Sequence, residues 1–239
     1  MKCFLTSSPT VGRTCVLNPA NGFVDEISSA VGAAPHALFI SSDPDNYGFT
    51  DGYAEMIRQG FRHIGISLRN YRTLDSRNAS NVSDLISESE LVVLAGGHVP
   101  TQNRFFAETG LRDATTGFDG VVLGISAGSM NSADTVYSPP ELDGEALDLG
   151  YQRFLKGLNL TQRMIVPHYD FWMNETLDGL DYVNGILRPD SLNRTFYALV
   201  DGSYLYSADG TEEIRGESYL IRNGEISPLA DKDDVYSLA

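Results

Sequence analysis

Near its middle the chain reads Val121-Val122-Leu123-Gly124-Ile125-Ser126-Ala127-Gly128-Ser129, in which an apolar run leads into a serine flanked by glycines. A Gly-x-Ser-x-Gly pattern between a buried strand and a helix is typical of a nucleophile elbow, a sharp turn that lifts the serine hydroxyl above the edge of a sheet. Bulky neighbours would clash there, which accounts for Gly124, Gly128 and the small Ala127. The pattern therefore predicts Ser126 as a nucleophile; a serine that merely caps a helix is the structural alternative.

Short apolar runs and longer amphipathic runs alternate on both sides of this segment. A βαβα alternation with continuously apolar strands predicts a mainly parallel sheet covered by helices on both faces, here as one α/β domain over residues 1–239. We expect strands at Cys3–Thr6, His36–Ile40, Gly65–Leu68, Leu91–Leu94, Val121–Gly124 and Met164–Val166, and helices at Phe23–Val31, Tyr53–Phe61, Ser83–Ile86 and Thr101–Thr109. Antiparallel strands are expected within Phe196–Tyr206 and Glu217–Ile221, with turns at Asp209-Gly210 and Asn223-Gly224.

Charge, apolar runs and cysteine spacing disfavour several kinds of partner, location and site. The net charge of −15 disfavours nucleic acid and anionic membranes as partners, because like charges repel. No apolar run is long enough for a signal peptide or a membrane span, so we expect a cytoplasmic protein. Cys3 and Cys15 show no metal-ligand spacing, which predicts two free thiols and no metal site.

A serine hydroxyl needs a base, and four histidines are available. His168 directly follows the predicted strand Met164–Val166, so it lies at the same sheet edge as Ser126 and is the predicted base. His36 and His63 suit structural roles. His98 follows the pair Gly96-Gly97 at another strand end, where it is expected to shape the site.

A carboxylate should orient the histidine, and backbone amides should hold the oxyanion. The amides of Gly97 and Ala127 are the predicted oxyanion hole. Between the serine and the histidine, spacing alone leaves five acids open: Asp134, Glu141, Asp143, Glu145 and Asp148.

Together, Ala95-Gly96-Gly97, Gly124–Ser129 and Pro167-His168-Tyr169 resemble the peptidase E (aspartyl dipeptidase) family, to which cyanophycinase is related. The run Gly216–Ile226 resembles the closing hairpin of that family. The resemblance implies a three-layer αβα sandwich like that of class I glutamine amidotransferases (flavodoxin-like), without a cofactor. It also implies Ser126 as nucleophile, His168 as base and Glu141 as acid.

The resemblance further implies a serine peptidase that hydrolyses short peptides as a dipeptidase or exopeptidase, with N-terminal aspartate as one expected substrate. His98, Arg104 and Arg163 are the candidates for binding substrate, and a monomer or a homodimer is expected. Two other functions stay open: an α/β-hydrolase-type esterase, which shares the Ser, acid, His order, and a non-catalytic binding protein of the amidotransferase-like fold.

Overall fold

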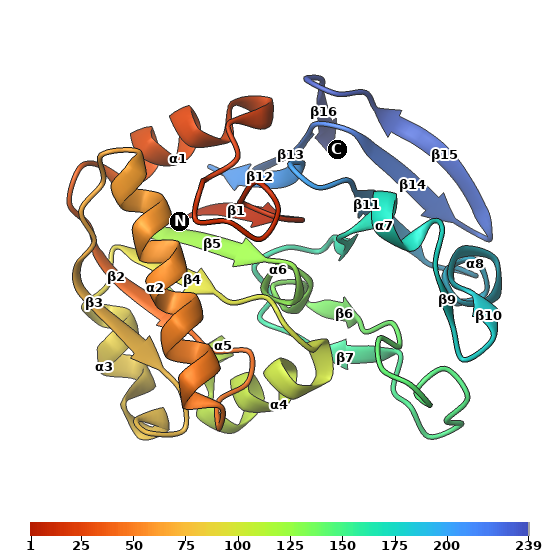
Figure 1. Cartoon of the computed structure of the whole chain (residues 1–239), viewed down its shortest axis with the longest axis horizontal. Coiled ribbons are helices and arrows are strands. Elements are labelled where there is room, and N and C mark those ends of the chain that lie inside the picture. Colours follow the sequence, from red (N-terminus) through yellow and green to blue (C-terminus); the bar gives the residue numbers. More distant parts are fainter. Residues whose placement is uncertain (239) are drawn as a thin grey trace.

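The computed structural model, which describes residues 1–238, is built around an eight-stranded sheet (Figure 1). Five neighbouring strands run parallel, and three antiparallel strands extend the sheet beyond the first strand of the chain. Their order is β16 (Val235–Leu238), β13 (Thr211–Arg215), β12 (Tyr204–Ala208), β1 (Lys2–Thr6), β5 (Val121–Ile125), β4 (Leu91–Leu94), β2 (His36–Ile40) and β3 (Arg69–Leu74).

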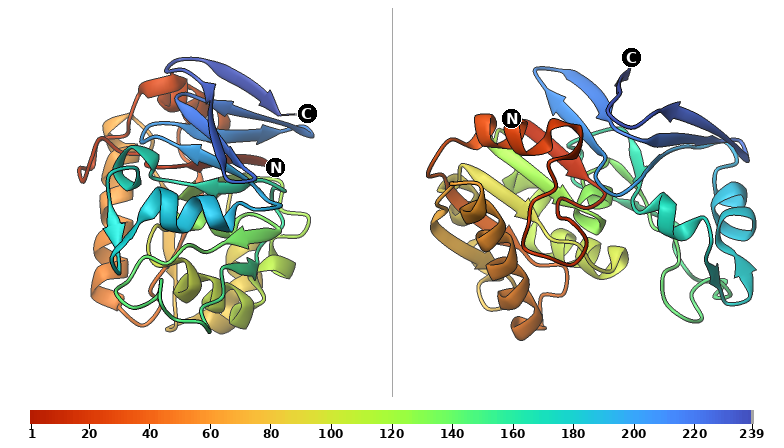
Figure 2. Two further views of the ribbon diagram at one scale, coloured as in Figure 1. Left: turned by 90° about the vertical axis from the view of Figure 1, so that its right-hand side faces the viewer. Right: turned by 45° about the horizontal axis from the view of Figure 1, so that its top comes forward.

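Helices cover both faces of the parallel strands, as the left view of Figure 2 shows with α2 and the helices of residues 99–114 on opposite sides. Successive residues of a strand point to opposite faces: Phe4 packs in the core that contains Ile57 of α2, and Leu5 in the core that contains Phe105 of α4. This confirms the expected αβα sandwich. The helices are α1 (Phe23–Val31) and α2 (Tyr47–His63) on one face, and α3 (Val82–Ser87), α4 (Val99–Thr109) and α5 (Leu111–Ala114) on the other.

A second, four-stranded sheet lies beside the first and is formed mostly by the last third of the chain. Its core includes Tyr137 stacked on Phe196 at 4.1 Å between ring centroids. The order is β15 (Glu225–Ala230), β14 (Ser218–Arg222), β11 (Thr195–Leu199) and β8 (Met164–Val166). The remaining elements are α6 (Ala127–Asn131), α7 (Tyr169–Trp172), α8 (Arg188–Asp190), the π-helical η3 (Tyr182–Leu187), the short 3₁₀ turns η1 (Ala20–Gly22) and η2 (Ala79–Asn81), and the hairpins β6 (Thr135–Tyr137) with β7 (Phe154–Lys156) and β9 (Thr176–Leu177) with β10 (Leu180–Asp181).

Two local predictions were wrong at their boundaries. Helix α2 begins at Tyr47 rather than Tyr53, because the Asn46 side chain caps it by accepting a hydrogen bond from the Phe49 N–H. The predicted strand at Gly65–Leu68 is a turn and an extended lead-in, and pairing with β2 begins only at Arg69.

The segment Phe196–Tyr206 holds two strands rather than continuous extended chain. A turn at residues 200–203 separates β11 from β12, and its Gly202 has a φ of 96°. Since β11 belongs to the small sheet and β12 to the large one, this turn joins the two sheets.

Cys3 is buried and Cys15 partly buried, and both are free thiols. Within residues 1–238, no helix has the length and apolar character that crossing a membrane requires.

Candidate active site

Ser126 occupies the turn between β5 and α6 with a backbone conformation that is rare for a non-glycine residue, φ 50° and ψ −110°. Close contacts explain why Gly124 and Gly128 carry no side chain. A Cβ on Gly124 would lie 2.9 Å from the Ser129 Cα, and one on Gly128 would lie 2.3 Å from the Leu94 carbonyl oxygen. The pattern therefore reflects the close packing of an elbow, and the Ser126 hydroxyl is only partly buried.

Ser126, His168 and Asp201 form a continuous hydrogen-bonded chain. The Ser126 Oγ lies 2.6 Å from His168 Nε2, and His168 Nδ1 lies 2.7 Å from Asp201 Oδ1. This geometry removes the support for a non-catalytic binding protein, which required His168 to lie apart from Ser126 with no acid behind it.

Sheet register explains why three residues so far apart in sequence meet. In the small sheet, Ala198 of β11 pairs with Val166 of the parallel β8, so the residues that follow each strand, His168 and Asp201, emerge side by side. In the large sheet, Thr6 at the end of β1 pairs with both Ile125 and Tyr204. The carboxyl end of β1 therefore lies between the elbow and the turn that carries Asp201.

Ser7, the buried residue directly after β1, contacts both His168 and Asp201 of the hydrogen-bonded chain. Its hydroxyl donates to Asp201 Oδ1 at 2.6 Å and lies 3.3 Å from His168 Nδ1. Partial burial alone would raise the pKa of Asp201, but the hydrogen bonds from His168 and Ser7 and the charge of His168 hold that pKa below its ordinary value. His168 itself has an unusual backbone φ of 131°. Sequence reasoning named neither Ser7 nor Asp201; the dipeptide Asp201-Gly202, a turn signal, could have revealed the acid.

Asp201, and not the predicted Glu141, is hydrogen bonded to His168. Glu141 follows β6 and is partly buried near the start of α4, where burial and the neighbouring Glu145 carboxylate raise its pKa to about 8, against a hydrogen bond from the Val99 backbone. The other predicted acids have separate partners or none near His168: Asp134 pairs with Arg112, Glu145 with His98, Asp148 accepts from the Gly150 N–H, and Asp143 is exposed.

The turn after β4 places Gly97 at the cavity that Ser126 also lines. The Ser42 Oγ donates to the Gly96 carbonyl at 2.6 Å, and a Cβ on Gly97 would meet that same Oγ at 2.3 Å. The hydroxyl of the partly buried Tyr53 lies against the Gly96 backbone, and burial raises its pKa to about 12. Ala127 is the first residue of α6, so its N–H has no acceptor within the helix.

The three residues predicted to bind substrate lie elsewhere. His98 is held between the Thr101 hydroxyl at 2.8 Å and the Glu145 carboxylate at 2.9 Å. Arg104 lies on the exposed surface of α4 and pairs with Glu108, and Arg163 pairs with Glu212 beside Tyr197. None of the three lines the cavity at Ser126.

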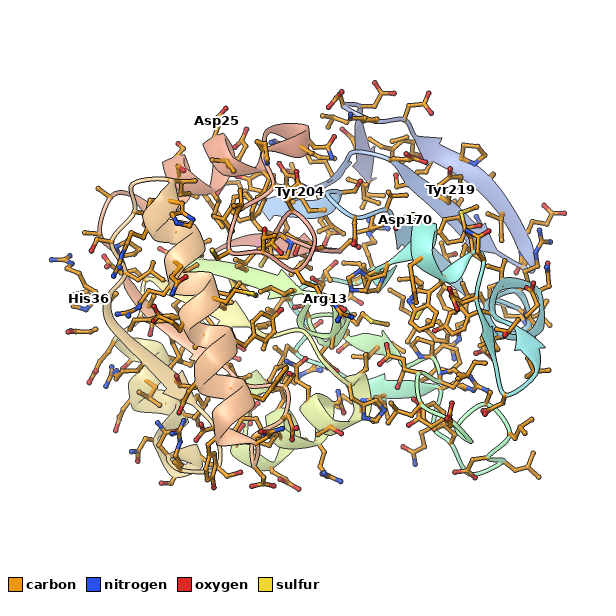
Figure 3. The ribbon with its side chains drawn as sticks, in the orientation of Figure 1. Arg13, Asp25, His36, Asp170, Tyr204 and Tyr219 are labelled. Atoms are coloured by element: carbon orange, nitrogen blue, oxygen red, sulfur yellow. The ribbon has the colours of Figure 1, made fainter. Side chains whose placement is uncertain are left out.

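A cavity of about 730 Å³ opens beside Ser126 and His168. One wall is helix α2, and the other is the loop that follows β1 and carries Arg13. Figure 3 shows Arg13 in the middle of the view, between α2 and α7. In the described part of the chain, no three His, Cys, Asp or Glu side chains gather as a metal site would require.

Comparison with known proteins gives one family. The sequence model of peptidase family S51 matches residues 3–215. The structure resembles a peptidase from an acI-B1 Actinobacterium (TM-score 0.66, 14% identity, 99% of this chain and 96% of that one). It also resembles a putative peptidase E protein from Listeria monocytogenes EGD-e (TM-score 0.54, 15% identity, 100% and 98%). No curated protein sequence matches this chain.

Proposed function

The chain belongs to peptidase family S51 and is a serine peptidase, and we propose that it cleaves short peptides as an exopeptidase through a triad of Ser126, His168 and Asp201. The hydrogen-bonded chain from the Ser126 hydroxyl to the Asp201 carboxylate carries this proposal, with its two links of 2.6 and 2.7 Å. In serine hydrolases of unrelated folds the base likewise lies between the nucleophile and the acid.

The reaction follows from these contacts. The Ser126 Oγ attacks the scissile carbonyl carbon while His168 Nε2 takes the hydroxyl proton, and Asp201 stabilises the imidazolium that forms. The N–H groups of Gly97 and Ala127 hold the oxyanion of the tetrahedral intermediate. His168 then gives its proton to the leaving amine, and water hydrolyses the acyl ester on Ser126.

Cavity size supports a short substrate. A volume of about 730 Å³ lies within the range of pockets that enclose small ligands, roughly 300–1,000 Å³. The two arginines expected to bind an N-terminal aspartate, Arg104 and Arg163, pair with Glu108 and Glu212 outside this cavity, so we propose no contact between either of them and the substrate.

Covalent labelling tests the proposal. A fluorophosphonate should modify the folded protein once, at Ser126, and Ser126→Ala should abolish labelling and lower peptide turnover by about 10⁴-fold or more. The matched control is Ser87→Ala, at an exposed serine of α3, which should label and turn over as the unaltered protein does. Failure of folded protein to label at Ser126 would refute the proposed function.

A further inference from the structure

Two glycines of α2, Gly48 and Gly52, face the cavity beside Ser126. A glycine within a helix weakens it relative to alanine, so packing usually accounts for one that is kept. Packing accounts for Gly60, where a Cβ would lie 3.2 Å from Leu17 Cδ2, but a Cβ on Gly48 or Gly52 would meet no atom within 4 Å. What these two glycines leave free is space in the cavity.

The walls around that space are apolar. Phe49, Tyr53, Met56 and Ile57 line it from α2, and Ile125 lines it from the end of β5. Phe49 is 48% exposed although its ring contacts the Tyr53 ring edge-on at 5.8 Å between centroids. A large apolar side chain left open to solvent beside a reactive serine is suited to contact an apolar group of a ligand.

Arg13 supplies a positive charge to this cavity. It is exposed, and among the described residues that line the cavity it is the one arginine or lysine. No carboxylate in the described part of the chain lies within ion-pair distance of it, in a protein whose net charge is −15. A guanidinium of this kind is free to bind a carboxylate of the substrate.

We propose that this cavity binds the C-terminal residue of the substrate, with a large apolar side chain against α2 and its free α-carboxylate on Arg13. Only the last residue of a peptide carries an α-carboxylate and a side chain together, and Ser126 at the same cavity then meets the peptide bond that precedes it. This inference rests on the proposed function and deepens it. The enzyme breaks the last peptide bond: the apolar amino acid leaves with the proton from His168, and one water molecule releases the acyl portion from Ser126.

Dipeptides of reversed order test whether the cavity binds the residue before or after the cleaved peptide bond. Ala-Phe should be cleaved with a kcat/KM about 100-fold above that of Ala-Ala, since filling an apolar pocket discriminates by about this factor. Phe-Ala should gain little over Ala-Ala. A preference for Phe-Ala over Ala-Phe would overturn the inference, whereas continued labelling of Ser126 would leave the proposed function intact.

Amidation of the substrate tests Arg13. Removing the carboxylate, as in Ala-Phe-amide, should lower kcat/KM about 10- to 100-fold in the unaltered enzyme, and Arg13→Gln should make that penalty disappear. The control is Arg62→Gln at an exposed position of α2 outside the cavity, which removes the same charge and should keep the penalty. An equal penalty in Arg13→Gln and in the unaltered enzyme would overturn the role of Arg13.

Gly52→Leu tests the open space directly. The variant should raise Tm by about 2–4 °C, because leucine favours the helix, and should lower kcat/KM for Ala-Phe at least about 10-fold while Ser126 still labels. Arg62→Leu adds the same side chain to α2 outside the cavity and should leave Ala-Phe turnover unchanged. Unchanged turnover of Ala-Phe in Gly52→Leu would show that the apolar side chain binds elsewhere.

Discussion

Asp201 and Glu141 are two carboxylates whose surroundings push their pKa values in opposite directions. Asp201, on the turn between β11 and β12, accepts hydrogen bonds that hold its pKa low despite partial burial. Glu141, after β6, has its pKa raised to about 8 by burial and by Glu145. At neutral pH only Asp201 carries the fixed negative charge that a histidine base needs. Strand register, rather than distance along the chain from Ser126, therefore determines which carboxylate reaches His168.

The largest expected effect comes from removing the charge of Asp201. Asp201→Asn should lower kcat by about 10⁴-fold, because the imidazole of His168 loses the group that sets its tautomer and stabilises its charged form. The rate of fluorophosphonate labelling at Ser126 should fall in parallel. Both are measured on protein whose fold is checked by circular dichroism.

Glu141→Gln is the matched variant, because it removes the other carboxylate in the same way. Glu141 makes no hydrogen bond to His168 in the described structure, so Ser126 should label at nearly the unaltered rate. The comparison breaks if Glu141→Gln slows labelling as much as Asp201→Asn does.

A smaller effect is expected on stability, and it should depend on pH. Between about pH 4.5 and pH 8 the folded protein keeps a proton on Glu141 that the unfolded chain has released, so the free energy of unfolding falls as the pH rises through this window. Glu141→Gln should therefore be more stable than the unaltered protein at about pH 9, on the order of 1–3 kcal/mol, and nearly equal at about pH 4. Urea unfolding at both pH values measures the difference.

The contribution of Asp201 to the free energy of unfolding depends on pH in the opposite direction. Its lowered pKa contributes stability above its unfolded value of 3.8, and that contribution is lost as the pH falls through the folded pKa. Equal pH dependence of stability in Glu141→Gln and in the unaltered protein would contradict the raised pKa of Glu141.

The smallest expected effect is that of Ser7→Ala. Ser7 is a positioning residue that acts through Asp201, so losing its hydrogen bond should cost about 0.5–1.5 kcal/mol, or roughly 3- to 10-fold in kcat, with KM unchanged. The loss of kcat that accompanies protonation of Asp201 should also occur at a higher pH, because Asp201 loses a donor that lowers its pKa. A loss of activity without this movement would indicate a purely structural role.

Most of the parallel strands and the helices between them were predictable, because each is indicated by a pattern within its own stretch of sequence. The helix at Phe23–Val31 and the strands at His36–Ile40 and Leu91–Leu94 begin and end where the sequence predicted. The glycines around Ser126 are required by contacts with the elbow's immediate neighbours, so the sequence pattern carries them.

The acid was missed for a physical reason. Its position depends on the crossing from β11 to β12, which reads as one β-rich run unless Asp201-Gly202 is recognised as a turn. No local pattern reports that Thr6 pairs with both Ile125 and Tyr204, and only this long-range register brings Ser7 to Asp201. The cavity arginine escaped for the same reason, because Arg13 lies in a loop whose place is set by the strands around it.

The first strand of the chain is bound on one side to β5 and on the other to β12, and the hydrogen bond from Ser7 to Asp201 spans 194 residues. During synthesis Ser126 leaves the ribosome before His168 and Asp201, the residues of its hydrogen-bonded chain. Asp201 lies on the turn before β12, so its contact with Ser7 can form only after the chain has been made beyond this turn.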